Sequence, residues 1–304
     1  NTTSGTLKQR FYKMNFFKKL FGVAKEEKTP TVEELQRADE KNFDILKFDG
    51  VKALKINSVG YAIECFTHAL NIKEDLEVRD YLSQAYVGVG DYNNAYQQLE
   101  KLAQAQPDNI GIFLRMAGIA YVMENYVLMS ASCEKALLVD SKSVEALFLY
   151  AKACIGTDDI TNAVAMLTKA IALNEEYAEA YLLRGEVYLS DGNLDDADND
   201  AAYLLNNYPD NEEALMLKAN IENKRGNAEQ AMEYYRKVID VNPFSKEALE
   251  NRALLRKQAG DAEGAKSDEE RLNEILSREQ EEGDQQGIES KVKESYNNIN
   301  PLGI

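Results

Sequence analysis

The sequence predicts an all-α protein, an α-solenoid of antiparallel helix pairs, and two periodic features support this. A glycine followed by Asp or Asn recurs at intervals of 102, 34 and 34 residues, at Gly90, Gly192, Gly226 and Gly260. Since 102 is three times 34, the unit is 34 residues. A proline follows three of these glycines by 17 residues, at Pro107, Pro209 and Pro243. Two interruptions per period indicate two helices per repeat, and a fixed period of this length indicates a stacked array.

Small residues mark the positions where the two helices of each repeat should approach closely. The first series has spacings of 33 and then 34 residues, at Gly50, Ser83, Ala117, Ala151, Gly185, Ala219 and Ala253. A second series lies twelve residues after each member and contains six alanines and Met129. Where the glycine turn is missing, Asn57, Glu124 and Asp158 occupy its place, and these positions also favour a helix end. Seven units follow, at 43–76, 76–109, 110–143, 144–177, 178–211, 212–245 and 246–278.

Within this register, residues 178–211 resemble the tetratricopeptide repeat, through Tyr181, Gly185, Tyr188, Ala197 and Pro209. Residues 76–109 match the same pattern, and the units at 43–76 and 110–143 match it less well. The resemblance covers residues 43–278. It implies a right-handed superhelix whose first helices line a concave groove, and it implies binding rather than catalysis.

Each end of the array has a predicted cap. Thr31 and Glu34 form a capping-box pattern, so we expect residues 31–42 to form an N-terminal capping helix. The last repeat helix, residues 261–278, places apolar residues on one side and charged residues, including Asp268, on the rest. Residues 279–304 are expected to form a flexible acidic tail, with one short amphipathic helix from Ile288 to Tyr296.

Charge separates the chain into a basic head and an acidic body. The formal net charge of -17 argues against nucleic-acid binding, which requires concentrated Lys and Arg. Residues 1–30 contain seven Lys or Arg. Met14 is a candidate natural start, so residues 1–13 are not used to infer function. Residues 14–25 combine phenylalanines with lysines, a pattern typical of weak contact with an anionic membrane surface, and the alternative is a tail that packs on the first repeat.

The remaining composition predicts a cytoplasmic protein that is not an enzyme. Three cysteines without CxxC spacing fit reduced, packed thiols, and no apolar run approaches the roughly 18 residues that span a bilayer. The single histidine, His68, has no nucleophile or orienting acid placed to serve it. Asp196, Asp198 and Asp200 imitate a calcium loop but lack its glycine and closing glutamate. We therefore expect no cofactor, no metal and no catalytic residue.

Candidate ligand contacts lie on the first helices in the same 34-residue register. An acidic series begins each helix, at Glu145, Glu179, Glu213 and Glu247. An apolar series follows it by three residues, at Phe148, Leu182 and Met216, with Leu114 one repeat earlier and Glu250 one repeat later. One turn further along the same face are Gly118, Lys152, Glu186, Asn220 and Leu254. The acidic residues could instead favour the helix N-terminus, and the apolar residues could be core.

These patterns predict a protein-interaction scaffold or adaptor that binds a basic or amphipathic segment of a partner protein in its groove. The alternative is a peripheral membrane-associated assembly factor, or a co-chaperone-like protein, tethered by its basic N-terminus. The carboxylate clamp of tetratricopeptide co-chaperones is incomplete here, because Lys47 and Arg115 fill two of its places but Val51, Tyr81 and Gly111 fill the others.

Overall fold

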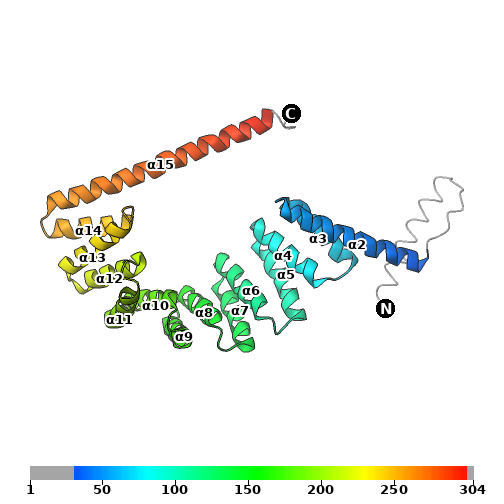
Figure 1. The fold of residues 1–304 in the computed structure, drawn as a ribbon, viewed down its shortest axis with the longest axis horizontal. Coiled ribbons are helices and arrows are strands. Elements are labelled where there is room, and N and C mark those ends of the chain that lie inside the picture. The colour runs from blue at the N-terminus through cyan, green and yellow to red at the C-terminus, as the bar shows by residue number, and fades with distance from the viewer. Residues whose placement is uncertain (1–30, 300–304) are drawn as a thin grey trace. The chain divides into compact units, whose positions relative to one another are not determined.

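The chain consists of consecutive α-helices, and no strand occurs among the residues described. The computed structural model describes residues 31–299, with their side chains as far as residue 280. Figure 1 labels the helices, which are α2 (Val32–Lys55), α3 (Val59–Ile72), α4 (Leu76–Gly88), α5 (Tyr92–Ala105), α6 (Ile110–Val122), α7 (Tyr126–Val139), α8 (Val144–Gly156), α9 (Ile160–Leu173), α10 (Ala178–Asp191), α11 (Leu194–Asn207), α12 (Glu212–Arg225), α13 (Ala228–Val241), α14 (Lys246–Gln258) and α15 (Ala262–Ile299). The predicted all-α class is confirmed.

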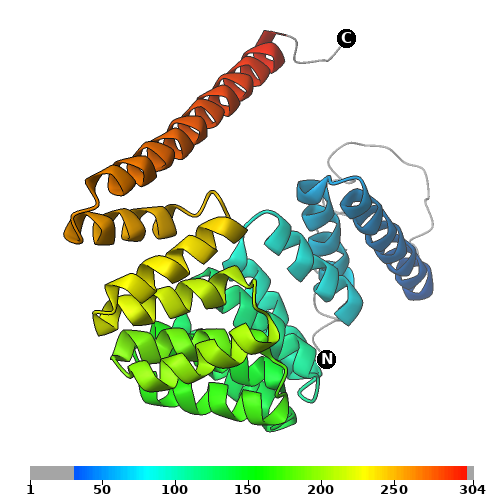
Figure 2. The same ribbon diagram turned by 60° about the vertical axis from the view of Figure 1, so that its left-hand side comes forward.

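The described helices form two compact units that divide between Val89 and Gly90. In the first unit, α2 packs on α3 and α3 packs on α4. In the second unit, each helix from α5 to α14 packs on the helix that follows it, and the first helices α10 and α12 also contact each other. Figure 2 shows the helix pairs of the second unit stacked one on the next. Neighbour-to-neighbour packing of this kind defines a solenoid.

The turns between paired helices confirm the 34-residue register. Left-handed backbone occurs at Gly90, Gly192, Gly226 and Gly260, with φ between 74° and 86°. It also occurs at the three slots without glycine, Asn57, Glu124 and Asp158, with φ between 54° and 60°. After each of the last two, the next residue donates its N–H to the carbonyl five residues back, from Asn125 to Ala120 at 2.9 Å and from Asp159 to Cys154 at 2.8 Å. This is the Schellman bond that ends a helix.

Within each unit, the two small-residue series lie where paired helices pack on each other. Every member of both series is buried, and most of the alanines are fully inaccessible to solvent. Gly50 and Gly185 have no room for a side chain. A Cβ built on Gly50 would lie 2.5 Å from the Phe66 ring, and one built on Gly185 would lie 2.7 Å from Leu217 Cδ2. Met129 is buried as well, although it is larger than the alanine that its repeat position usually holds.

The N-terminal helix differs from the predicted division at residue 43. Thr31 and Glu34 form the expected capping box, since the Glu34 N–H donates to Thr31 Oγ1 at 3.2 Å and the Thr31 N–H donates to Glu34 Oε2 at 2.8 Å. From there α2 continues to Lys55 without a break. Residues 31–42 are therefore the first half of one helix rather than a separate cap, because nothing between them and Phe43 interrupts helical hydrogen bonding.

The C-terminal helix also differs from expectation. Helix α15 continues through Gly283 and Gly287, where the sequence predicted a flexible connector and then a separate short helix. Isolated glycines weaken a helix by about 1 kcal/mol each but do not end it, and the flanking Glu and Gln are good helix formers. Asp268, which was predicted to be on the charged exterior, is instead buried against Arg252, with an Nη2–Oδ1 distance of 2.6 Å. We retain the other domain boundaries as a proposal.

Candidate binding face on the first helices of the second unit

The predicted binding residues lie on α6, α8, α10, α12 and α14, all within the second unit. We call the stripe that they form the first-helix face. The acidic series at its edge is exposed at every position, at Glu145, Glu179, Glu213 and Glu247. The next residue of each helix is a fully buried alanine, from Ala146 to Ala248. The helices therefore bury one side against their neighbours and leave the acidic side accessible to a ligand.

The apolar series is half-buried, so it is neither pure core nor pure surface. Phe148, Leu182 and Met216 each pack on a different hydrophobic cluster of the second unit. Each also retains accessible surface, as does Leu114 on α6. Contact with the core restricts these side chains before any ligand arrives, which lowers the entropic cost of binding to them.

Aromatic rings and one cation extend the apolar series on α6 and α8. Lys152 Nζ lies 4.1 Å from the centroid of the Tyr121 ring and 5.8 Å from that of Phe148. The Phe148 and Tyr177 rings are 5.2 Å apart and tilted by 52°. Sequence reasoning missed Tyr121 and Tyr177. Tyr121 is three residues beyond Gly118 on the same helix face, so the register could have identified it.

Carboxylates dominate the other end of the first-helix face, on α10, α12 and α14. Removal from bulk water, together with the nearby carboxylates of Glu213 and Glu247, raises the pKa of the Glu186 carboxyl. Asn220 Nδ2 donates to Glu247 Oε1 at 3.1 Å, and Tyr235 Oη donates to Asn220 Oδ1 at 2.6 Å. No ion pair involving these three carboxylates occurs in the described part of the chain.

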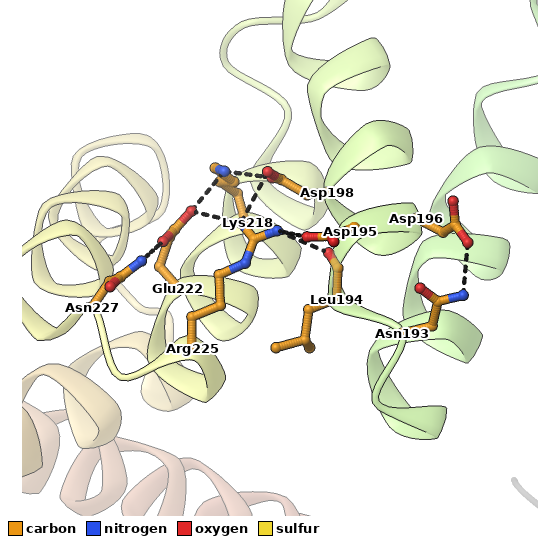
Figure 3. Close-up of polar contacts among 9 residues, drawn as sticks. All are labelled: Asn193, Leu194, Asp195, Asp196, Asp198, Lys218, Glu222, Arg225 and Asn227. Carbon is orange, nitrogen blue, oxygen red and sulfur yellow. Dashed lines mark hydrogen bonds and ion pairs between the residues drawn. The ribbon is translucent and has the colours of Figure 1, made fainter.

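Carboxylates away from this face are neutralised by the chain itself. Figure 3 shows Asp198 and Glu222 directed at Lys218 and Arg225 between α11 and α12. The Arg225 pair to Asp198 is 3.0 Å long, and the Lys218 pair to Glu222 is 2.7 Å long. Burial acts to raise the pKa of Asp198, but the Lys218 and Arg225 cations hold that pKa below its usual value. The second unit therefore contains both satisfied carboxylates and accessible unpaired ones.

The three aspartates that imitate a calcium loop have separate partners. Asp196 accepts a hydrogen bond from Asn193 Nδ2 at 2.6 Å, and Asp198 belongs to the Lys218 network. Asp200 is buried and accepts from Arg184 Nη2 at 2.7 Å and from Nε at 2.9 Å. Their carboxylates are thus used in three different places. No group of His, Cys, Asp or Glu suited to a metal occurs among residues 31–280.

Two further residues considered in the sequence analysis, Lys47 of the incomplete carboxylate clamp and the single histidine His68, lie in the first unit. Lys47, one of the two matching clamp residues, binds Glu77 at 2.6 Å and Asp75 at 3.3 Å, so it is already neutralised within the first unit. His68 is exposed and lines an open hollow of about 650 Å³ with Asp39 and Asn42.

The amphipathic residues 14–25, for which membrane contact was predicted, lie outside the described residues. Among residues 31–299, no helix combines the length and apolarity needed to cross a bilayer.

Comparison with known proteins agrees with the repeat register. A sequence profile described as tetratricopeptide repeat matches residues 155–221, and a second profile of the same description matches residues 212–245. The sequence matches no curated protein.

Solved structures share the fold at low sequence identity. A tetratricopeptide repeat protein from Parabacteroides merdae ATCC 43184 is 16% identical with a TM-score of 0.61, over 77% of this chain and 93% of that one. PilW, a type IV pilus biogenesis factor, is 21% identical with a TM-score of 0.58, over 66% of this chain and 94% of that one. MamA from Desulfovibrio magneticus RS-1 is 14% identical with a TM-score of 0.52, over 56% of this chain and 96% of that one. The two profiles together identify residues 155–245 as tetratricopeptide repeats, and the seven left-handed turns, spaced by 33 or 34 residues, continue the same register from Asn57 to Gly260.

Proposed function

We propose that the chain is a non-enzymatic scaffold whose first-helix face binds a basic, amphipathic segment of a partner protein. The tetratricopeptide fold supports a protein-interaction role in general. The finer proposal depends mainly on one observation. Glu186, Glu213 and Glu247 are exposed carboxylates whose charges act on one another and with which no Lys or Arg of the described chain pairs, whereas the buried Asp200 and Asp268 are each paired with an arginine.

The electrostatics of this cluster favour a cationic ligand. A carboxyl whose pKa is raised by desolvation and like charge is stabilised in its ionised form when a cation approaches. Lys or Arg side chains of a partner would therefore relieve repulsion that the free protein retains. Charge complementarity of this kind chiefly increases the association rate and excludes acidic segments.

The apolar series sets the second requirement on the ligand. Phe148, Leu182 and Met216 follow one another every 34 residues, one on each successive first helix. A partner helix with apolar residues at i, i+4 and i+7 presents a matching stripe, with lysines on its flanks. The Tyr121, Phe148 and Tyr177 rings add aromatic surface at one end. We place the protein in the cytoplasm, where the three buried thiols remain reduced.

Synthetic probes test this proposal without knowledge of the natural partner. Two fluorescent 14-residue amphipathic helices share the same Leu and Phe stripe, one with lysines and one with glutamates on the flanks. Fluorescence anisotropy should show binding of the lysine peptide alone. The triple variant Glu186→Gln, Glu213→Gln and Glu247→Gln should weaken that binding by about threefold to 150-fold, since each partly exposed charge pair is worth roughly 0.2–1 kcal/mol and 1.4 kcal/mol corresponds to tenfold.

A matched control separates local charge from net charge. Glu229→Gln, Glu263→Gln and Glu274→Gln remove three exposed carboxylates from α13 and α15, and should leave affinity within about twofold at 0.15 M salt, where distant charges are screened. Equal affinity for both peptides, or equal loss in both triple variants, would contradict the proposal. Carboxylate variants are preferable to changes at Phe148 or Leu182, because those side chains also pack on the core.

A further inference from the structure

The open hollow on the first unit lies at a repeat position that is core elsewhere in the chain. The hollow, of about 650 Å³, is lined by Ile45 and Leu46 on α2 and by His68 and Ile72 on α3. Ile45 is 47% exposed. The residues at the same position of the later first helices are at most 4% exposed, and they are Val78, Ile112, Ala146, Ala180, Ala214 and Ala248. Of the described repeats, only the first therefore leaves this position open to solvent.

In the later repeats, the second helix of the preceding repeat packs on this position. Val78 on α4 belongs to the same hydrophobic cluster as Phe66 and Ala69 on α3. Ala248 on α14 belongs to the same cluster as Tyr235 on α13. Among the described residues no helix precedes α2, so its equivalent surface is uncovered. A stacked repeat buries its apolar surface against its neighbours, so the hollow lies where one more helix would pack.

Helix α2 also extends beyond its partner α3. It has 24 residues, whereas α3 has 14, and its residues 32–42 are exposed apart from the half-buried Leu35. Leu35, Ala38 and Ile45 are separated by three and seven residues, which places them on one side of the helix. This apolar side leads from the start of α2 into the hollow.

We propose that residues 14–25 of the same chain occupy the hollow, as a helix that folds back antiparallel to α2. Residues 26–31 connect this segment to the first residue of α2, and a connection of this length spans up to about 20 Å, more than the roughly 8–10 Å between the axes of packed helices. A helix made of residues 14–25 is about 18 Å long, so its far end reaches the level of the hollow. In this register Leu20 lies beside Leu35, and Phe16 lies beside the hollow.

The composition of residues 14–25 matches this surface in apolar spacing and in charge. Spacings of one and four residues place its large apolar side chains on one side of a helix, at Phe16, Phe17, Leu20 and Phe21. The segment contains three lysines and no acidic residue. Residues 32–45 of α2 contain five acidic and two basic residues, and α3 contains Glu64 and no Lys or Arg. Opposite charge thus favours the contact, and the short connection gives the segment a high effective concentration.

Docking of this segment has two consequences for the chain. It caps the N-terminal end of the array, which a solenoid requires because its first repeat has no neighbour on one side. It also buries the aromatic side chains of residues 14–25, so the segment cannot lie on a membrane surface at the same time.

Hydrogen exchange on the full chain in lipid-free buffer measures docking, since a docked helix exchanges only when it opens. Ile45→Glu places a charge in the hollow and removes an apolar contact, so exchange of residues 16–21 should become about tenfold faster or more. Ile56→Glu is the matched control. Ile56 is 69% exposed at the other end of α2, and its replacement should leave the exchange rate of the segment unchanged. Circular dichroism checks that both variants retain the wild-type helicity.

Changes in the segment should act on α2 in return, because the coupling between two sites is reciprocal. Leu20→Glu should speed exchange of residues 32–42 of α2 and leave exchange of the second unit unchanged. Asn15→Glu adds the same charge on the opposite side of the segment, so it should have no such effect.

A tryptophan reporter places the segment in an apolar site directly. The chain has no native tryptophan, so Phe17→Trp adds a single indole. Before any lipid is added, its fluorescence emission should be blue-shifted from that of an indole in water. Adding Ile45→Glu should shift the emission back to the red, whereas adding Ile56→Glu should not.

Three results would overturn the proposal. Exchange of residues 14–25 as fast as that of an unstructured peptide would show that the segment does not occupy the hollow. A blue shift of the Phe17→Trp reporter that appears only after phosphatidylserine vesicles are added would assign the segment to a membrane surface. Protection that increases with protein concentration would assign the hollow to the same segment of a second copy.

Discussion

Replacing Gly185 by Leu tests the helix packing on which the register depends. Gly185 is buried in the middle of α10, where α10 approaches α11 and α12. A Cβ at this position would lie 2.7 Å from Leu217 Cδ2 and 3.4 Å from Asp200 Cβ. Leu217 is only 3% exposed, so it has little room to move away. A leucine adds three further carbons to this contact.

The expected cost follows from two opposing effects. Overpacking a filled core costs about 1–3 kcal/mol, and the short contact at Leu217 places this change at the upper end. Removing a glycine from a helix interior returns about 1 kcal/mol. The net loss of unfolding free energy should be about 2 kcal/mol, which corresponds to a Tm lower by about 4–8 °C for a unit of this size.

Thermal unfolding followed by circular dichroism measures this change, with one control and one rescue. Gly118→Ala is the control, because a Cβ on Gly118 meets nothing within 4 Å, and it should stabilise the protein by about 0.5–1 kcal/mol. Leu217→Ala is the rescue. In the Gly185→Leu background it should cost at least about 1 kcal/mol less than in the wild type, because the new leucine fills the space.

Two results would refute the packing argument. A Tm unmoved by Gly185→Leu would mean that α10 and α12 do not approach at this residue. Strict additivity of Gly185→Leu and Leu217→Ala would mean that the two side chains do not compete for the same volume. Hydrogen exchange should localise any loss of protection to α10, α11 and α12, since solenoid repeats are stabilised by their neighbours.

Three further changes test the ion pairs, the turns and the pH response. Arg184→Ala leaves Asp200 buried without its cation and should cost about 3–5 kcal/mol in urea unfolding, whereas Arg236→Ala, in an exposed pair, should cost less than about 1 kcal/mol. Glu124→Gly relieves a φ of 54° and should raise stability by up to about 1 kcal/mol, seen as a higher Tm. Binding of the lysine peptide requires ionised Glu186, and the pKa of this carboxyl is raised above its ordinary value of 4.5. Affinity should therefore be full above the raised pKa and should fall as the pH drops through it. Anisotropy titrations with the Glu186→Gln variant should show a flatter pH profile.

The sequence was sufficient for the repeat architecture because turn chemistry is local. Glycine is the residue that adopts left-handed backbone most readily, and a fixed interval reveals its slots even where Glu124 or Asp158 replaces it. The small residues of each helix pair were equally visible, since close approach limits side-chain volume. Outside the repeats the hydrophobic period is weak, so the helix ends there could not be predicted in this way. Helix α2 has no break at residue 43, and helix α15 continues past residue 278.

For the proposed first-helix face, the sequence supplied the repeat period and the structure supplied the exposure of each side chain. Its acidic and apolar series share the repeat period, so the sequence located Glu213 and Met216 on one stripe. Whether the apolar residues were core or surface depended on how far neighbouring helices cover them, and the structure shows that they are half-buried. Asp268 was misplaced because its burial depends on Arg252, sixteen residues earlier on the facing helix.

By itself, therefore, the sequence determined the all-α class, the repeat period and the residues at each turn, because these depend on backbone conformation within a few residues. Tertiary structure alone decided which carboxylates are neutralised. Asp198 and Asp200 differ from Glu186 in their neighbours on other helices, and not in any local pattern. Electrostatic neutralisation acts through space over a few ångströms, so only the packed helices show which carboxylates are paired and which are not.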